Sequence, residues 1–126
     1  MDKTQLLTQA EWQVMELLWK KPHTLTELVA ALDNTTGWSK STVATMVRRM
    51  EGKGIISHTE GEKAKLFHPA ISQSDAALRE TRSLLDRAYH GSLGMMVSTL
   101  ARRDGLTKED IDELYAILRK AEEDAK

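Results

Sequence analysis

A chain of 126 residues fits one compact unit, or a small domain with an appendage, and leaves no room for a large enzyme. Hydrophobic residues make up 40% and charged residues 29%, as in foldable proteins, and the absence of cysteine excludes disulfides, thiolate nucleophiles and thiolate metal clusters. No apolar stretch approaches the roughly 18 residues of a membrane-spanning helix, and the N-terminus lacks the pattern of a signal peptide. We therefore expect a cytoplasmic protein without direct membrane association.

The net charge of −1 hides an uneven distribution along the chain. Residues 37–70 contain six basic side chains against three acidic ones, whereas residues 107–126 contain four against seven. Clustered positive charge is the electrostatic feature that nucleic-acid binding requires. The middle of the chain is therefore the place to look for such a surface.

Two short helices are predicted at the N-terminus. Thr8 followed three residues later by Glu11 is typical of a capping box, and the apolar spacing behind it predicts a helix from about Gln9 to Lys20. Thr24 and Glu27 repeat the pattern ahead of a second, shorter helix.

A third helix follows a turn that ends at Gly37. Ser39 is placed to cap this helix, which should reach about Gly52, while Trp38 and Val43 occupy the positions of a hydrophobic staple. One apolar stripe consists of Val43, Met46, Val47 and Met50. Polar and basic side chains therefore occupy the other faces of this helix.

A β-hairpin is predicted next, with strands at residues 55–59 and 63–68 and a turn at residues 60–62. Three helices followed by a hairpin is the order of a winged helix-turn-helix. The predicted fold class is therefore mainly α with a small β-hairpin: a winged helix-turn-helix DNA-binding domain at residues 1–70 and a helical dimerisation region at residues 71–126.

The C-terminal region is expected to hold three helices. Ser72 can cap a long helix that runs to Gly91, Asp104-Gly105 breaks the next one, and Thr107 can cap the last. The apolar stripes have nothing large to bury against within one chain, which favours a homodimer. The residues expected in this dimer contact are Leu84, Leu85, Leu93, Met96, Val97, Leu100, Ile111, Leu114, Tyr115 and Leu118.

Candidate DNA contacts lie on the third helix and on the hairpin. Hydroxyl groups can bond base edges or phosphates, and basic side chains fix register through salt-dependent phosphate contacts. The alternative is an ordinary solvated helix surface, with Arg48 or Arg49 paired to Glu51 or another acid. The candidates are Ser39, Lys40, Ser41, Thr42, Thr45, Arg48, Arg49, Lys53, Lys63 and Lys65.

Other kinds of site are weakly supported by the sequence. The tryptophans Trp12, Trp19 and Trp38 fit core packing better than a platform for stacked bases. The four histidines lack the spacing of a metal site, and no phosphate-binding loop, nucleophile elbow or zinc-protease signature is present. We expect no enzyme, no cofactor and no bound metal.

The segments LTQAEWQVMELLW and WSKSTVATMVRRMEGKGII, with a hairpin that ends in FHPAIS, resemble the penicillinase and methicillin-resistance repressor family (BlaI/MecI). The resemblance covers nearly the whole chain and implies a homodimer that binds a palindromic operator through its N-terminal domains. Many relatives have a long basic residue where this sequence has Ala44, so the operator or its affinity can differ.

The resemblance also implies how such a repressor is released. In the antibiotic-responsive branch a membrane-bound sensor metalloprotease signals the drug, and the repressor is cut within its dimerisation region. The matching position here is Thr99-Leu100, where members of that branch have Asn-Phe, so cleavage is left open. The copper-responsive branch carries C-terminal Cys-x-Cys segments, which this chain lacks.

The function predicted from the sequence is that of a homodimeric bacterial transcriptional repressor on the operator of a resistance or stress operon. The alternatives are a winged-helix protein-interaction module and a regulator that responds to a small molecule. Steep salt dependence of DNA affinity would separate the first alternative from a repressor.

Overall fold

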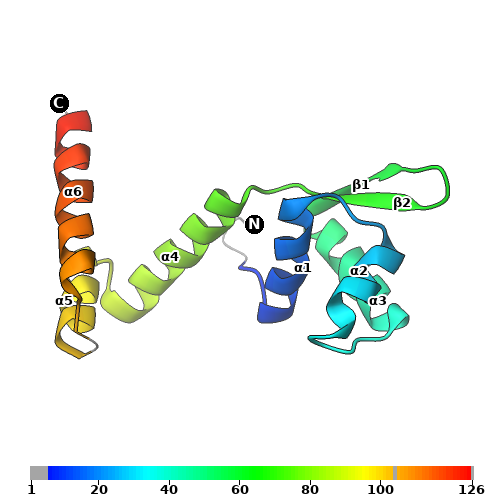
Figure 1. Cartoon of the computed structure of the whole chain (residues 1–126), viewed down its shortest axis with the longest axis horizontal. Helices are drawn as coiled ribbons and strands as arrows, with labels where there is room; N and C mark the ends of the chain where they lie inside the picture. Colours follow the sequence, from blue (N-terminus) through cyan, green and yellow to red (C-terminus); the bar gives the residue numbers. More distant parts are fainter. Residues whose placement is uncertain (1–5, 104, 126) are drawn as a thin grey trace. The chain divides into compact units, whose positions relative to one another are not determined.

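The computed structural model describes residues 6–103 and 105–125, and its elements follow the predicted order of helices, hairpin and helical tail (Figure 1). The first three helices are α1 (Gln9–Lys20), α2 (Leu25–Asp33) and α3 (Lys40–Gly52). Strands β1 (Ile56–Glu60) and β2 (Lys65–Pro69) pair in antiparallel fashion, and the tail contains α4 (Gln73–Tyr89), α5 (Leu93–Arg103) and α6 (Lys108–Asp124). The predicted class, mainly α with a small β-hairpin, is confirmed.

Capping residues determine where α1, α2 and α6 begin. The Thr8 side chain accepts a hydrogen bond from the backbone N–H of Glu11 at 3.1 Å, and the Glu11 carboxylate accepts one from the backbone N–H of Thr8 at 2.9 Å. Thr24 caps α2 and Thr107 caps α6 with the same reciprocal arrangement. Each box satisfies two backbone donors that a helix N-terminus otherwise leaves unpaired, which fixes where the helix begins.

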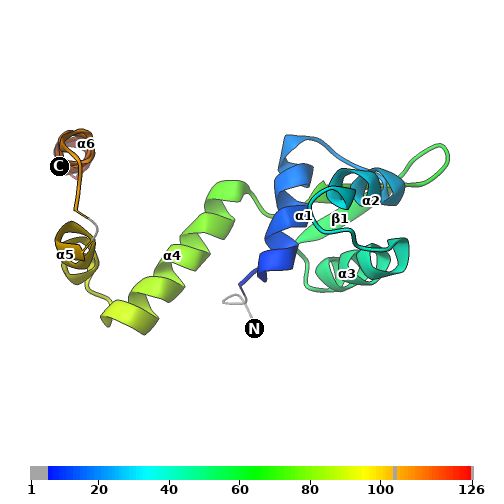
Figure 2. The ribbon, with the colours of Figure 1, turned by 60° about the horizontal axis from the view of Figure 1, so that its bottom comes forward.

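Strand β1 lies one residue later than predicted, and β2 starts two residues later and ends one residue later. Glu60 lies in β1 and pairs with Lys65, where opposite charges face each other across the strands. The turn is therefore displaced to residues 61–64, and the N–H of Gly61 donates to the carbonyl of Ala64 at 2.9 Å. The hairpin projects beyond the three helices in both views (Figures 1 and 2).

One hydrophobic core joins α1, α2, α3 and the hairpin. An additional β-bridge between His23 and Phe67 fastens the α1–α2 connection to β2, with N–H to O distances of 3.2 and 2.8 Å between the backbone nitrogen and oxygen atoms. The buried side chains of the core are Val14, Met15, Leu18, Leu28, Leu32, Val43, Val47, Met50, Ile55, Ile56 and Phe67. The apolar stripe predicted on α3 thus supplies three of them, and Met46 packs partly buried beside them.

The chain divides into two compact units, an N-terminal unit up to Thr81 and a C-terminal unit from Arg82. The division falls inside α4 because its first turns belong to the N-terminal unit, where Ala76 is only 4% exposed. The boundary at residue 70 between a DNA-binding and a dimerisation region stays a prediction about function.

The helices of the C-terminal unit leave several large apolar side chains exposed. No described residue of α5 or α6 is buried, and Leu93, Tyr115 and Leu118 are 57%, 58% and 60% exposed. Of the predicted break at Asp104-Gly105, Asp104 lies outside the described residues, whereas Gly105 has a φ of 74°. A membrane-crossing helix, judged by length and apolar character, is absent from the described part of the chain.

A matched pair of glycine substitutions tests the hairpin turn. A methyl group at Gly61 would overlap the carbonyl oxygen of Ala64, whereas one at Gly52 would meet nothing nearby. We expect Gly61→Ala to lower the free energy of unfolding by about 1–3 kcal/mol, and Gly52→Ala to leave it unchanged or raise it by up to about 1 kcal/mol. Urea unfolding of the two full-length variants at equal concentration measures both; equal effects would contradict the turn described here.

Candidate nucleic-acid interface

Helix α3 has one apolar face and one polar face. Val43, Val47 and Met50 are buried in the core, whereas Ser41, Thr42, Arg48 and Arg49 are exposed. Thr45 lies among the exposed residues and is half-buried. The polar face therefore presents hydroxyl and guanidinium groups together, as a helix that enters a DNA groove would need.

Ser39 has a structural role at the start of this helix. Its side chain accepts a hydrogen bond from the backbone N–H of Thr42 at 3.2 Å, as the sequence predicts for an N-cap. The same hydroxyl lies 3.0 Å from the hydroxyl of Thr42 and 3.2 Å from that of Ser41. The three hydroxyls thus form one cluster at the N-terminus of α3.

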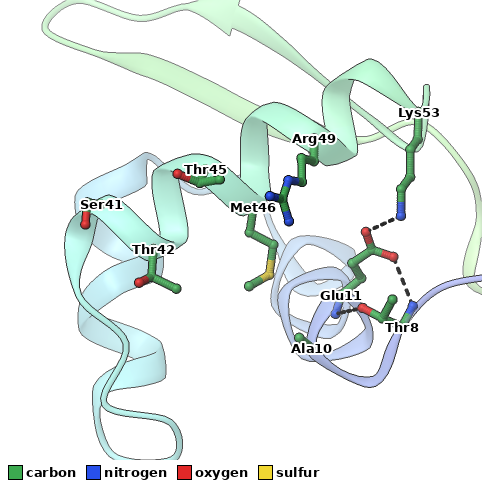
Figure 3. Close-up of a pocket in the computed structure, with 9 residues that line it drawn as sticks. All are labelled: Thr8, Ala10, Glu11, Ser41, Thr42, Thr45, Met46, Arg49 and Lys53. Atoms are coloured by element: carbon green, nitrogen blue, oxygen red, sulfur yellow. Dashed lines mark hydrogen bonds and ion pairs between the residues drawn. The ribbon is translucent and has the colours of Figure 1, made fainter.

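Two grooves flank the polar face of α3. The first lies between α3 and the start of α1, and Figure 3 shows Ser41, Thr42, Thr45 and Arg49 along its α3 side. The second lies between α3, the start of α2 and the hairpin. The basic residues that line this second groove are Lys40, Arg48 and Lys65.

The sequence-predicted contacts therefore divide between two sides of one helix. Lys63 is exposed near the end of the hairpin and lines neither groove. Ala44, which the sequence singles out for its short side chain, lines the groove next to the hairpin. A cationic group on each flank of a helix matches the two phosphate backbones that border a DNA groove.

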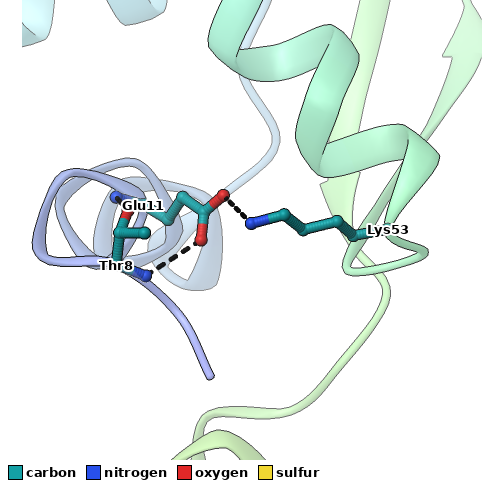
Figure 4. A network of polar contacts seen from close by, with 3 residues as sticks. All are labelled: Thr8, Glu11 and Lys53. Atoms are coloured by element: carbon teal, nitrogen blue, oxygen red, sulfur yellow. Dashed lines mark hydrogen bonds and ion pairs between the residues drawn. The ribbon is translucent and has the colours of Figure 1, made fainter. Parts of the chain in front are cut away.

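Lys53 is engaged inside the protein. Its ammonium group lies 2.6 Å from one carboxylate oxygen of Glu11, whose other oxygen accepts from the N–H of Thr8 (Figure 4). Glu11 is only 5% exposed and the side chain of Lys53 is 26% exposed. Breaking such a pair leaves a buried charge without compensation, so this contact fastens the end of α3 to the start of α1.

The sequence assigns Glu11 only to the cap and assigns Lys53 to DNA. No local pattern joins them, because they are separated by 42 residues. The role of Lys53 in phosphate binding stays a prediction, and the pair with Glu11 competes with it.

The two arginines of α3 differ from Lys53 in their ion pairing. Within residues 6–103 and 105–125, neither Arg48 nor Arg49 forms an ion pair. Glu51, the partner proposed for them as an alternative, instead contacts the ring of His58 on β1. Both arginine side chains are exposed.

His58 connects the hairpin to α3. Its Nδ1 contacts the Glu51 carboxylate, its Nε2 lies 3.6 Å from a carboxylate oxygen of Glu60, and its ring packs edge-on against Phe67 at a centroid distance of 6.0 Å. Among the described residues no group of three or more histidine, aspartate or glutamate side chains is arranged to hold a metal ion.

The tryptophans pack in the N-terminal unit. Trp19 and Trp38 lie partly buried against the core, and the rings of Trp12 and Trp19 meet edge to face at 5.6 Å. This arrangement agrees with the predicted packing role.

Comparison with known proteins identifies relatives over most of the chain. A sequence model of the family described as penicillinase repressor matches residues 7–120. The penicillinase repressor of Bacillus licheniformis is 35% identical over 119 residues, which cover 94% of this chain and 93% of that protein. The methicillin resistance regulatory protein MecI of Staphylococcus aureus (strain N315) is 25% identical over 120 residues, 94% of this chain and 98% of that protein.

Two solved structures resemble the N-terminal part. The solution structure of the DNA-binding domain of the repressor BlaI is 32% identical, has a TM-score of 0.52, and covers 60% of this chain and 93% of that one. The Bacillus licheniformis BlaI monomeric form in complex with the blaP half-operator is also 32% identical, with a TM-score of 0.51 and the same coverage.

The salt dependence of DNA affinity distinguishes a cation that contacts a phosphate from one that is paired inside the protein. Each lost phosphate contact should reduce the slope of log K against log salt by about 0.9. We expect Arg49→Gln to show this reduction and Lys53→Gln to leave the slope unchanged, because Lys53 is neutralised by Glu11. Fluorescence-anisotropy titrations at several salt concentrations measure the slope for each variant. An equal reduction in the two variants would show that Lys53 contacts a phosphate.

Proposed function

The chain belongs to the penicillinase repressor family, and we propose that it is a homodimeric bacterial transcriptional repressor that binds a palindromic operator. The observation that carries the proposal is the polar face of α3, where hydroxyl groups lie between cations on two flanks. A resistance or stress operon is the proposed target, and the cytoplasm the proposed compartment. Repression in a family of this kind is a binding function and needs no catalytic site.

Helix α3 would enter the major groove with its polar face toward the bases. Ser41, Thr42 and Thr45 would bond base edges or touch a thymine methyl group. Lys40, Arg48 and Lys65 would contact one phosphate backbone and Arg49 the other, with Lys63 on the hairpin as a further phosphate contact. These contacts would give both register and the salt dependence expected of operator binding.

The tail would join two such chains. Isolated monomers rarely expose large contiguous apolar surface, yet α5 and α6 expose Leu93, Met95, Leu100, Tyr115 and Leu118. A second copy is the partner with matching apolar faces, and two-fold symmetry would place the two α3 helices on adjacent half-sites about 34 Å apart. The proposed functional regions are residues 1–70 for DNA and residues 71–126 for dimerisation.

Dimerisation would also be the step that controls repression. The dimer would occlude the promoter. When one DNA-binding domain is bound to its half-site, it keeps the other domain near the second half-site at a high effective concentration. Separating the two chains would therefore lower operator affinity steeply without changing any DNA contact.

Proteolysis by a membrane-bound sensor metalloprotease is the proposed route of release. The Thr99-Leu100 bond lies within α5, where the Thr99 hydroxyl donates to the carbonyl of Met95 at 2.9 Å. A helical bond must unfold locally before a protease can cut it, and α5 has no buried described residue to oppose that opening. Incubating the chain with membranes that contain the activated sensor, and mapping fragments by mass, tests this step.

A pair of aspartate substitutions on α6 tests the dimer. Leu118 lies on the face that also carries Ile111 and Tyr115, whereas Ala116 lies on the opposite face of the same helix. We expect Leu118→Asp to weaken binding to the chain's own upstream promoter fragment by at least about tenfold, because a charge in an apolar contact disfavours pairing. Ala116→Asp should change the affinity by less than about threefold.

Fluorescence anisotropy against the promoter fragment and a scrambled duplex measures these affinities. Equal losses in the two variants would contradict a dimer contact on the Leu118 face. Weak binding of the unaltered chain that ignores sequence would instead favour a protein-interaction module.

A further inference from the structure

The chain that leaves the hairpin is held against α1. The indole N–H of Trp19 donates to the carbonyl oxygen of Ile71 at 2.9 Å, across 52 residues of sequence. Ile71 lies between β2 and α4, and this connection runs beside α1 in both views (Figures 1 and 2). The contact is therefore made where the DNA-binding elements end and the tail begins.

The residues around Ile71 are fixed at further points. The N–H of Ala70 donates to the carbonyl of Ile55 at 2.8 Å, and the Ser72 side chain caps α4 by accepting from the N–H of Asp75 at 3.0 Å. Ala76, in the first turns of α4, is buried. The start of α4 is thus tied to the same unit that carries α3.

We propose that Trp19 is a positioning residue that fixes the direction in which α4 leaves the DNA-binding unit, and thereby the half-site spacing that the dimer accepts. The inference rests on the proposed function, since spacing has meaning only for a chain that binds two half-sites as a dimer. Helix α4 begins at Gln73, two residues after the carbonyl group that the Trp19 indole holds, so the contact acts on the start of this helix.

The energetic consequence follows from DNA geometry. One added base pair displaces a half-site by about 3.4 Å and rotates it by about 35° around the duplex. A connection that is held firmly cannot follow this change, so affinity falls sharply. A loosened connection tolerates the change but lowers the effective concentration of the second domain on the natural spacing.

The indole N–H is the group to remove. Trp19→Phe keeps an aromatic ring against the core and deletes the donor to Ile71. Trp12→Phe is the matched control, because it alters the other member of the same aromatic pair and leaves the Trp19 donor in place. A glycine inserted between residues 71 and 72 loosens the same connection and leaves the Trp19 side chain unaltered.

The experiment uses the full chain and three duplexes derived from the upstream segment that it protects in footprinting. These are the natural palindrome, the palindrome lengthened by one central base pair, and a single half-site. We expect the unaltered chain and Trp12→Phe to prefer the natural spacing by about tenfold or more, and Trp19→Phe and the glycine insertion to prefer it by less than about threefold. Single half-site affinity should stay within about twofold for all four.

Each departure has a distinct meaning. If Trp19→Phe and the insertion discriminate spacing as strongly as Trp12→Phe, the positioning role is wrong while the dimeric repressor stands. If Trp19→Phe also loses affinity for the single half-site, the insertion variant alone tests the positioning role. The role is then wrong if the insertion variant prefers the natural spacing as strongly as Trp12→Phe does. If the unaltered chain binds the palindrome no better than a single half-site, the proposed function fails and the inference falls with it.

Discussion

Helices α5 and α6 impose the main physical constraint on this molecule, because none of their described residues is fully buried. The described residues of α5 and α6 leave every large apolar side chain at least partly exposed, while the whole hydrophobic core lies in the N-terminal unit. An isolated helix as short as α5 is marginal in water because nucleation is costly, and most helical stability in proteins comes from tertiary packing. The proposed dimer answers this constraint, since a second copy offers apolar faces of the same kind.

In the N-terminal unit, by contrast, the end of α3 is held by contacts with two other elements. The buried pair of Glu11 and Lys53 fixes the end of α3 to α1, and the contact of Glu51 with His58 fixes the same end to β1. Neither contact involves Arg48 or Arg49, and neither arginine forms an ion pair within the described residues. In the proposed function, Lys53 at the C-cap of α3 therefore has a positioning role, whereas Arg48 and Arg49 contact phosphates.

Local sequence patterns predicted the parts of the fold that depend on neighbours along the chain. The boxes at Thr8 and Thr24 marked the helix starts, and the spacing of Val43, Val47 and Met50 identified the buried face of α3, because capping and periodicity are both short-range. The hairpin turn was misplaced because the cross-strand pairing of Glu60 with Lys65 is decided by register and not by composition.

The long-range side-chain contacts could not be found in this way. Glu11 meets Lys53 across 42 residues and Trp19 meets Ile71 across 52, and neither end of these pairs has a local signal that names its partner. The residue types alone indicate that a partner is needed. When it is buried, a capping glutamate has a second carboxylate oxygen, and a tryptophan has an indole N–H, that requires a hydrogen-bond partner. The candidate DNA contacts, by contrast, were found from residue type and helix phase alone, and their roles remain proposals.

Sedimentation velocity combined with far-ultraviolet circular dichroism across a dilution series of the full chain tests most directly whether the tail depends on a second copy. We expect a species with the mass of two chains at micromolar concentration, and a loss of helical signal as dilution separates them. A single chain at every concentration, with an unchanged helical signal, would show that the tail holds its structure alone and would contradict the dimer on which repression is proposed to depend.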